Sequence, residues 1–159
     1  MNRITASILI AASSIFAVVT TASSLEAPAV TTSTVPIPPA ARCPMWWSLA
    51  VQQGFDIDDM QTLDRIIYRE SRCDTTQHNA YDPNGGSHGL TQINGFWCKP
   101  SRYYPLGYLQ TMQILHTCDE LYEPSVNLRA AFALVEYSRS EGLDAWSQWA
   151  WLYSDSTDS

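Results

Sequence analysis

Glu70 occupies a position where the sequence pattern predicts an apolar side chain. It lies in the stretch IIYRESRC and extends by one turn an apolar helical stripe with steps of three and four residues, formed by Met60, Leu63, Ile66 and Ile67. A buried carboxylate either pairs with a cation or becomes neutral through a raised pKa. Pairing with Arg69 or Arg102 is the simpler interpretation, whereas a raised pKa would suit Glu70 to general acid–base catalysis.

Two later segments carry polar residues that could complete a site around this carboxylate. The segment GLTQIN, residues 89–94, follows the turn-forming run DPNGG, and the segment PSVNL begins at Pro124. Asp82 at the start of the turn-forming run is a second carboxylate within the same region. Because Asp-Pro-Asn-Gly is a sequence typical of turns, we favour a plain turn role for Asp82.

The elements that would position these residues are mostly helices. Hydrophobic spacing and end signals predict helices over residues 44–53, 58–73, 109–116, 125–141 and 143–153. Asp58 or Asp59 and Ser125 are the expected N-caps of the second and fourth helices. Asp64 falls largely off the apolar stripe. Between the helices, residues 74–88 form a loop or tight β-ribbon and GLTQIN forms a strand or short helix, so the predicted class is mainly α (α+β).

Three blocks taken in order resemble the soluble lytic transglycosylase domain of the lysozyme-like superfamily. They are Glu70-Ser71, GLTQIN and PSVNL, where the family has Glu-Ser, Gly-Leu-Met-Gln followed by Ile or Val, and Pro-x-x-Asn-Ile or -Leu. The likeness covers residues 43–151. It implies a lysozyme-like fold with a small loop or β-ribbon insertion between helices.

The resemblance also implies a role for each matched residue. Glu70 would be the single catalytic acid and base that cleaves the β-1,4 bond between N-acetylmuramic acid and N-acetylglucosamine in peptidoglycan, leaving 1,6-anhydro ends. Ser71 would orient Glu70 by a hydrogen bond. The sugar site would be lined by Gly89, Leu90, Thr91 and Gln92, with Asn127 bracing the cleft.

This sequence departs from the family pattern at three places. Thr91 stands where the family usually has Met, and Leu134 stands where it often has Tyr. The later family block Ala-Tyr-Asn-Ala-Gly is replaced by DAWSQWAW. Trp149 and Tyr153 are therefore candidates for the aromatic contact with the glycan near Glu70.

Two other functions compete with the transglycosylase interpretation. A lysozyme-type hydrolase would use Asp82 to position water, which requires carboxyl groups roughly 6.5–9.5 Å apart. A non-catalytic exported module would bind glycan or a protein partner through the Trp-rich C-terminal segment.

The two ends of the chain show a different composition from the middle. Residues 1–24 have a basic start, an apolar stretch and a small-residue end, which predict a secretory signal peptide, with a retained membrane anchor as the alternative. Residues 25–42 are rich in Pro and Thr and predict a flexible linker. The folded domain is expected over residues 43–153, followed by a polar flexible tail at 154–159.

The charge of the chain bears on its partners. The formal net charge is −7 at pH 7, and removal of the signal peptide, whose one charged side chain is Arg3, would leave −8. Such a surface argues against nucleic-acid binding and offers little attraction to an anionic cell wall. The expected partner is the peptidoglycan glycan strand, bound by a monomer without a cofactor.

Four cysteines predict two disulfides in a secreted protein. Three pairings are possible, and we favour Cys43–Cys73, which would tie the start of the domain to the end of the Glu70 helix, together with Cys98–Cys118. The cysteines and histidines show no CxxC or HExxH spacing, so no zinc site is expected.

Overall fold

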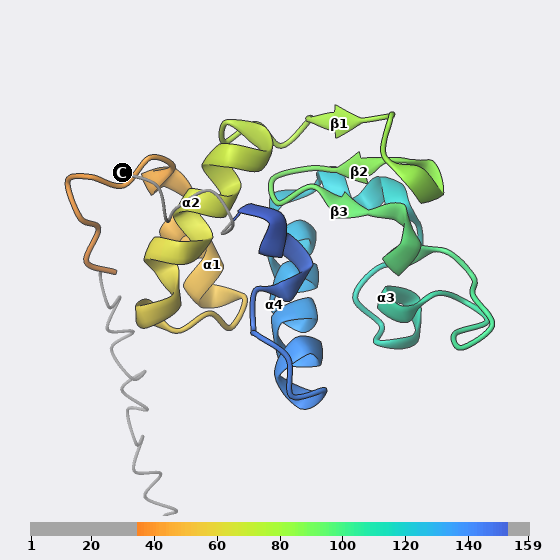
Figure 1. Ribbon diagram of the computed structural model, residues 1–159. Helices are drawn as coiled ribbons and strands as arrows, with labels where there is room; N and C mark the ends of the chain where they lie inside the picture. The colour runs from red at the N-terminus through yellow and green to blue at the C-terminus, as the bar shows by residue number, and fades with distance from the viewer. Residues whose placement is uncertain (1–34, 153–159) are drawn as a thin grey trace, which may run out of the picture. The chain divides into compact units, whose positions relative to one another are not determined.

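The computed structural model describes residues 35–152, with only the backbone described for residues 150–152. Within this range four α-helices and a small three-stranded sheet form a mixed α+β fold (Figure 1). The predicted signal peptide, most of the predicted linker and the predicted tail lie outside the described residues. No helix in the described part of the chain is long and apolar enough to cross a membrane.

Helices α1 (Trp47–Gln52) and α2 (Met60–Ser71) are tied together at one end by the first disulfide. Cys43 before α1 bonds to Cys73 after α2, and their Cα atoms lie 5.6 Å apart. This is one of the two pairs favoured from the sequence. The bond anchors the chain directly behind the last turn of α2, where Glu70 lies.

Asp64 of α2 faces the interior, although its spacing placed it off the apolar stripe. Asp64 is only 4% exposed, and its side chain accepts three hydrogen bonds. The donors are the backbone N–H groups of Arg42 (2.8 Å) and Cys43 (2.9 Å) and the indole N–H of Trp47 (2.9 Å). These donors compensate the cost of burying the carboxylate and fix the chain entering α1 against α2.

The chain before Cys43 also packs against this part of the domain. Val35 and Ala41 are partly buried against the hydrophobic core. Packing therefore starts several residues before Cys43, within the segment that the sequence predicts as linker.

The segment between α2 and α3 forms the predicted β-ribbon. Strands β1 (His78–Asn79), β2 (Ser87–His88) and β3 (Ile93–Asn94) pair antiparallel in chain order, so β2 lies in the centre. The run DPNGG makes the turn between β1 and β2, with a 3-10 turn at Pro83–Gly85. Figure 1 shows this sheet leaving the C-terminal end of α2.

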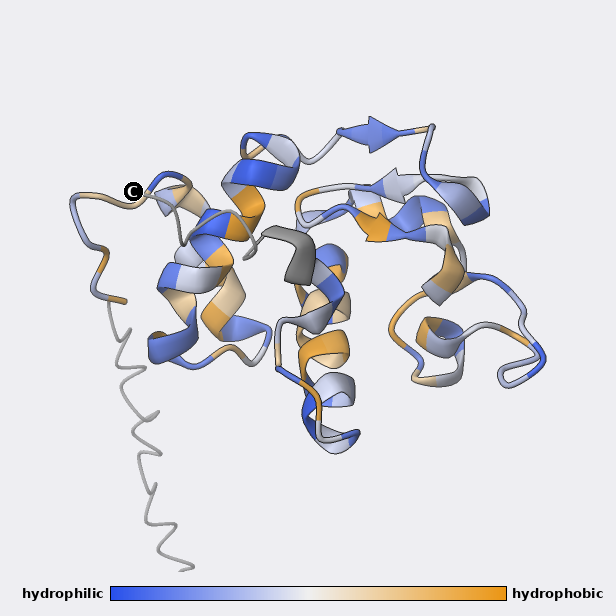
Figure 2. Ribbon diagram, viewed as in Figure 1, coloured by the Kyte–Doolittle hydropathy of each residue, from blue (hydrophilic) through white to orange (hydrophobic). Residues whose placement is uncertain are grey.

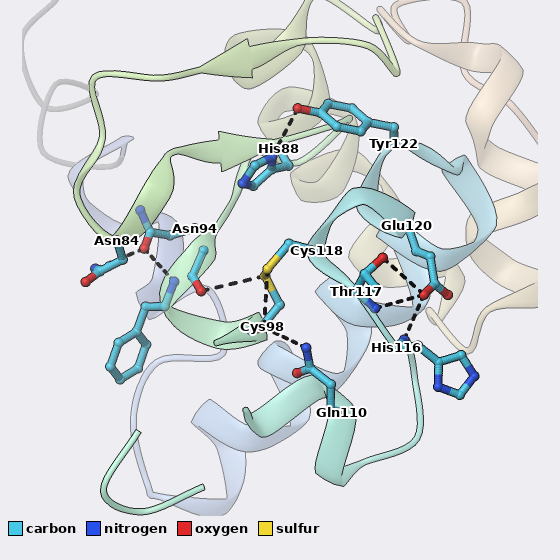
Figure 3. Close-up of a disulfide and its surroundings, with 12 residues drawn as sticks. Asn84, His88, Asn94, Cys98, Gln110, His116, Thr117, Cys118, Glu120 and Tyr122 are labelled. Carbon is cyan, nitrogen blue, oxygen red and sulfur yellow. Dashed lines mark hydrogen bonds between the residues drawn. A yellow bond between two sulfur atoms is a disulfide. The ribbon is translucent and has the colours of Figure 1, made fainter. Parts of the chain in front are cut away.

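The second disulfide joins the segments on either side of α3 (Tyr108–Thr111). Cys98 ends a 3-10 turn that follows β3, and Cys118 begins the 3-10 turn Cys118–Tyr122 (Figure 3). The Gln110 side chain donates a 2.6 Å hydrogen bond to the carbonyl of Cys98. The pairing Cys98–Cys118 is the other one favoured from the sequence.

The turn Cys118–Tyr122 is fixed at both ends. Thr117 and Glu120 form a capping box, in which Glu120 Oε1 accepts from the Thr117 backbone N–H at 2.9 Å. At the other end the Tyr122 hydroxyl lies 3.1 Å from Nδ1 of His88 in β2 (Figure 3). The turn thus contacts the sheet directly.

Helix α4 (Pro124–Ser140) lies at the centre of the domain and contacts α1, β3 and the C-terminal 3-10 segment Ser147–Leu152. Figure 2 shows apolar residues concentrated in α2, β3 and α4, whereas β1 is hydrophilic. The buried face of α4 comprises Asn127, Leu128, Ala130, Ala131, Leu134, Val135 and Ser138.

Asn127 is the polar member of this buried face and joins α4 to the sheet. Its Oδ1 accepts from the backbone N–H and the hydroxyl of Thr91, at 3.0 and 2.7 Å. Its Nδ2 donates to the carbonyls of His88 (3.0 Å) and Leu121 (2.8 Å). Gly89 passes so close that an added Cβ would clash with the Leu121 carbonyl and the Asn127 amide, and its φ of +73° also favours glycine. We call these contacts the Asn127 network.

Two predicted helices are shorter than expected. Residues 109–116 form only the single turn α3, because Gln113 adopts a φ of +57°, which interrupts a right-handed helix. In the region 143–153 the described residues form the 3-10 segment Ser147–Leu152, which is broken at Trp149.

The predicted helix caps also differ from the structure. Helix α4 starts at Pro124, whose fixed φ suits the first helical position, and the Ser125 side chain does not cap it. Asp59 precedes α2 without a side-chain capping bond and instead forms an ion pair with Arg139, at 3.0 Å.

The Asn127 network predicts a large effect from an isosteric change. Asn127→Asp removes both donors and places carboxylate oxygen against the carbonyls of His88 and Leu121. Because each buried unsatisfied polar group costs about 1–3 kcal/mol, we expect the free energy of unfolding to fall by about 2–5 kcal/mol in urea denaturation. Gln52→Glu makes the same chemical change at an exposed position of α1 and should change it by less than about 0.5 kcal/mol. Equal losses in both variants would contradict this role of Asn127.

Candidate functional site

Glu70 lies in the last turn of α2, beside the buried Ile66 and Ile67. The residue is half-buried, and its Oε1 is buried without a hydrogen-bond partner. Burial raises the pKa of Glu70 to about 7, with a further increase from the charge of Asp82 and a decrease from Arg69. Glu70 therefore retains its proton up to near neutral pH, as a general acid must.

Asp82 lies in the turn between β1 and β2, where its charge acts on Glu70. Its carboxylate is held by two side chains of the flanking strands. Asn79 Nδ2 donates to Oδ1 at 2.8 Å, and the Ser87 hydroxyl donates to Oδ2 at 2.6 Å. Asp82 thus stabilises the turn, as favoured from the sequence, and also provides a second carboxylate near Glu70.

Ser71 is buried and directs its hydroxyl to the helix backbone. The hydroxyl donates to the carbonyl of Ile67 at 3.0 Å, a bond within the same helix. The hydrogen bond to Glu70 that the resemblance implies is not among the bonds of the described residues. The hydroxyl proton of Ser71 is therefore engaged by the backbone of its own helix.

Most of the residues expected to line a sugar site are buried. Gly89, Leu90, Thr91 and Asn127 have almost no exposed surface. A side chain without exposed surface cannot touch a substrate, so Leu90 and Thr91 offer no side-chain contact, and Asn127 acts from within the fold, as expected of a residue that braces the cleft. These residues support the sheet from beneath through the Asn127 network.

Gln92 and Trp149 are the other described residues that the sequence proposed as sugar contacts. Gln92 is partly exposed and has a φ of +49°, and its Nε2 donates to the carbonyls of Gln77 and Gly89, both at 2.9 Å. Trp149, proposed from the sequence as a glycan contact, is 3% exposed, and its indole N–H donates to the Thr91 carbonyl at 2.8 Å. Trp149 is thus part of the interior. Tyr153 lies outside the described residues.

Sequence reasoning missed the residues that hold Asp82 in place. Asn79 and Ser87 face each other across β1 and β2. The sequence signal for these two residues is weak, because strands of two residues are too short to show the alternation of apolar and polar residues that identifies a strand. Asn and Ser on either side of a turn sequence were the only sign of this arrangement.

The described residues offer two neighbouring carboxyl groups, one of which, Glu70, has a raised pKa. Among residues 35–152 no group of three or more His, Cys, Asp or Glu side chains could hold a metal ion. No family model, curated protein or solved structure matches the chain. The arrangement of Glu70 and Asp82 is suited to proton transfer to and from a bound substrate.

The influence of Asp82 on Glu70 can be measured directly. Asp82→Asn removes the second-largest cause of the raised pKa, so the pKa of Glu70 should fall but stay above 4.5, because burial remains. Carbon-13 NMR titration of the Glu70 carboxyl group measures this change. Asp56→Asn, at an exposed position before α2, should leave the Glu70 titration unchanged. A Glu70 pKa that Asp82→Asn does not lower would contradict the coupling.

The raised pKa also predicts a pH-dependent cost of Glu70 to stability. The folded state binds the Glu70 proton more tightly than the unfolded state, so this contribution falls as pH rises from 4.5 through about 7. Glu70→Gln removes this dependence. We expect the variant to match the parent protein at pH 4 and to exceed it by about 1–2 kcal/mol at pH 8, after allowance for solvent screening of a half-buried group.

Urea denaturation at both pH values measures this difference. Glu141→Gln, at an exposed position beyond α4, is the matched control and should show no such pH-dependent gain. A Glu70→Gln curve parallel to that of the parent protein over pH 4–8 would show that Glu70 titrates normally.

Proposed function

We propose that the protein is an exported peptidoglycan-cleaving enzyme, a lytic transglycosylase with a lysozyme-like fold, in which Glu70 is the catalytic acid and base. The observation that carries this proposal is the half-buried Glu70, whose pKa is about 7 and whose Oε1 has no protein partner. A carboxyl group in this state can donate a proton at neutral pH. The sequence blocks around Glu70, Thr91 and Asn127 supply the reaction class by resemblance.

In the first step Glu70 protonates the oxygen of the glycosidic bond between N-acetylmuramic acid and N-acetylglucosamine. The bond from C1 of the muramic acid to this oxygen breaks, and N-acetylglucosamine leaves with a free 4-hydroxyl. The carbonyl oxygen of the 2-acetamido group forms a bond to C1 and stabilises the oxocarbenium-like centre. Glu70 is left as a carboxylate.

In the second step the Glu70 carboxylate accepts the proton of the 6-hydroxyl of the same muramic acid. This oxygen attacks C1, the bond from C1 to the acetamido oxygen breaks, and a 1,6-anhydro ring forms. Glu70 regains its proton, so the enzyme returns to its starting state without water. Half-burial of Glu70 supports both steps, because it keeps the two protonation states close in free energy near pH 7.

The two disulfides fit an oxidising compartment outside the cytoplasm, where peptidoglycan lies. The signal peptide predicted at residues 1–24 would deliver the chain there. The enzyme would act on the glycan strand as a monomer.

A hydrolase is the second candidate, because the charge of Asp82 reaches Glu70. Asp82 would position a water molecule that attacks C1, and the product would carry an ordinary reducing end. The firm hold of Asn79 and Ser87 on Asp82 supports this role, since a carboxylate that positions water must itself be fixed.

Clearing of a peptidoglycan suspension tests the catalytic role of Glu70. Glu70→Gln should lower the clearing rate by about 10²–10⁴-fold, since the amide cannot donate the proton, whereas Glu141→Gln should retain the parent rate. The parent rate should fall as pH rises above 7, where Glu70 loses its proton. Undiminished clearing by Glu70→Gln would show that Glu70 is not the catalytic acid, whereas absence of clearing by the parent protein would favour the non-catalytic binding module.

Mass spectrometry of the products separates the two catalytic candidates. A transglycosylase releases 1,6-anhydro ends and retains activity in Asp82→Asn, with the alkaline loss of activity moved to lower pH. A hydrolase releases reducing ends and loses activity in Asp82→Asn. Products with reducing ends alone would contradict the transglycosylase proposal.

A further inference from the structure

An aromatic pocket lies on α4 and the segment around α3. Figure 1 shows α3 and α2 on opposite sides of α4, so the pocket is separate from the end of α2 that carries Glu70. Its volume of about 380 Å³ is within the range of small-molecule sites, roughly 300–1,000 Å³. The aromatic side chains that line it are Phe96, Trp97, Tyr103, Tyr104, Tyr108 and Tyr137.

The base of the pocket is a rigid group of three rings. Trp97, Tyr108 and Tyr137 make mutual edge-to-face contacts, with ring centroids 5.3–5.5 Å apart. The neighbouring Cys98 is fixed by its disulfide to Cys118. A ligand would therefore meet preformed aromatic surfaces and would not have to order them.

Three of the four tyrosine hydroxyls of the pocket lack a hydrogen-bond partner among the described residues, whereas the Tyr103 hydroxyl accepts from the Arg102 guanidinium. Within the described residues, the hydroxyls of Tyr104, Tyr108 and Tyr137 make no hydrogen bond. The rings of Tyr104 and Tyr137 each lie 5.3 Å from the ring of Tyr108, measured between centroids. The pocket thus combines apolar faces with hydroxyl groups that lack protein partners.

The rim of the pocket is aromatic and exposed. Phe96 is 48% and Tyr103 66% exposed. No carboxylate, lysine or arginine lines the pocket, and the guanidinium of the adjacent Arg102 lies over the Tyr103 ring, 4.5 Å from its centroid. An uncharged ligand suits these walls better than an anion, because the lining offers no cation to pair with.

We propose that this pocket is a carbohydrate-binding site for an uncharged pyranose sugar. The C–H face of a pyranose ring carries partial positive charge and packs on the negative faces of aromatic rings. The tyrosine hydroxyls would bond the hydroxyl groups at the ring edge. Binding at this site goes beyond cleavage and requires no catalytic action of Glu70.

NMR titration with tetra-N-acetylchitotetraose, an uncharged oligosaccharide, tests the proposal. The full chain carries Glu70→Gln, so that the probe is not cleaved, and the reading is taken at Trp97, which lines the aromatic pocket. The probe should shift the indole N–H resonance of Trp97 in a saturable manner. No shift as the probe rises to about 10 mM would overturn the proposal.

Substitutions then locate the site. Phe96→Ala with Tyr103→Ala removes exposed rim rings and should weaken binding at Trp97 about tenfold or more. Tyr137→Phe removes only a hydroxyl and should weaken it about three- to tenfold. Leu143→Ala, at an exposed position outside the pocket, should leave it unchanged.

Binding that Phe96→Ala with Tyr103→Ala and Tyr137→Phe leave intact would place the sugar elsewhere and overturn the proposal. Because these readings come from a variant that cannot use Glu70, they are independent of peptidoglycan clearing. Failure of the cleavage assay and failure of sugar binding are thus separate results.

Discussion

The buried amide of Asn127 is the interaction on which the position of the sheet depends. Strands of two residues supply few ladder hydrogen bonds, so they cannot fix the sheet alone. Asn127 binds the chain at His88 and Thr91, on both sides of the turn that joins β2 to β3. Since β2 also fixes the turn that carries Asp82, one side chain of α4 determines where that carboxylate lies.

The site itself opposes the stability of the fold. Glu70 lies half-buried with an unpartnered oxygen, and Asp82 adds like charge to the same region. Both features raise the free energy of the ionised state, and the surrounding structure must offset it. The Cys43–Cys73 disulfide just beyond the last turn and the hydrogen bonds to Asp64 stabilise α2 against this cost. Such local cost is expected where a group has a chemical task.

The sequence predicts which residues can take part in chemistry, and which helix faces are apolar, better than it predicts how deeply each residue is buried. Glu70 was found because apolar spacing identifies an inward position, and Asp82 was found through a turn sequence. Asp64 was misplaced because the buried face of α2 is wider than one stripe; it lies four residues after Met60, on the same side. Thr91 was expected to contact sugar, yet residue type does not reveal that Asn127 covers it. Burial of this kind depends on contacts 36 residues apart, which local patterns do not contain.

The acidic composition limits how the proposed enzyme could approach an anionic cell-wall polymer. With a net charge of −7, long-range electrostatics oppose contact with an anionic polymer, and salt only weakens that repulsion. Attraction must then come from short-range forces that ignore net charge. Rings held edge to face, with hydroxyls left free, offer this kind of contact to an uncharged sugar. The sugar binding proposed for the aromatic pocket is therefore compatible with an acidic surface, because such a pocket would select the part of a glycan that the protein's charge does not repel.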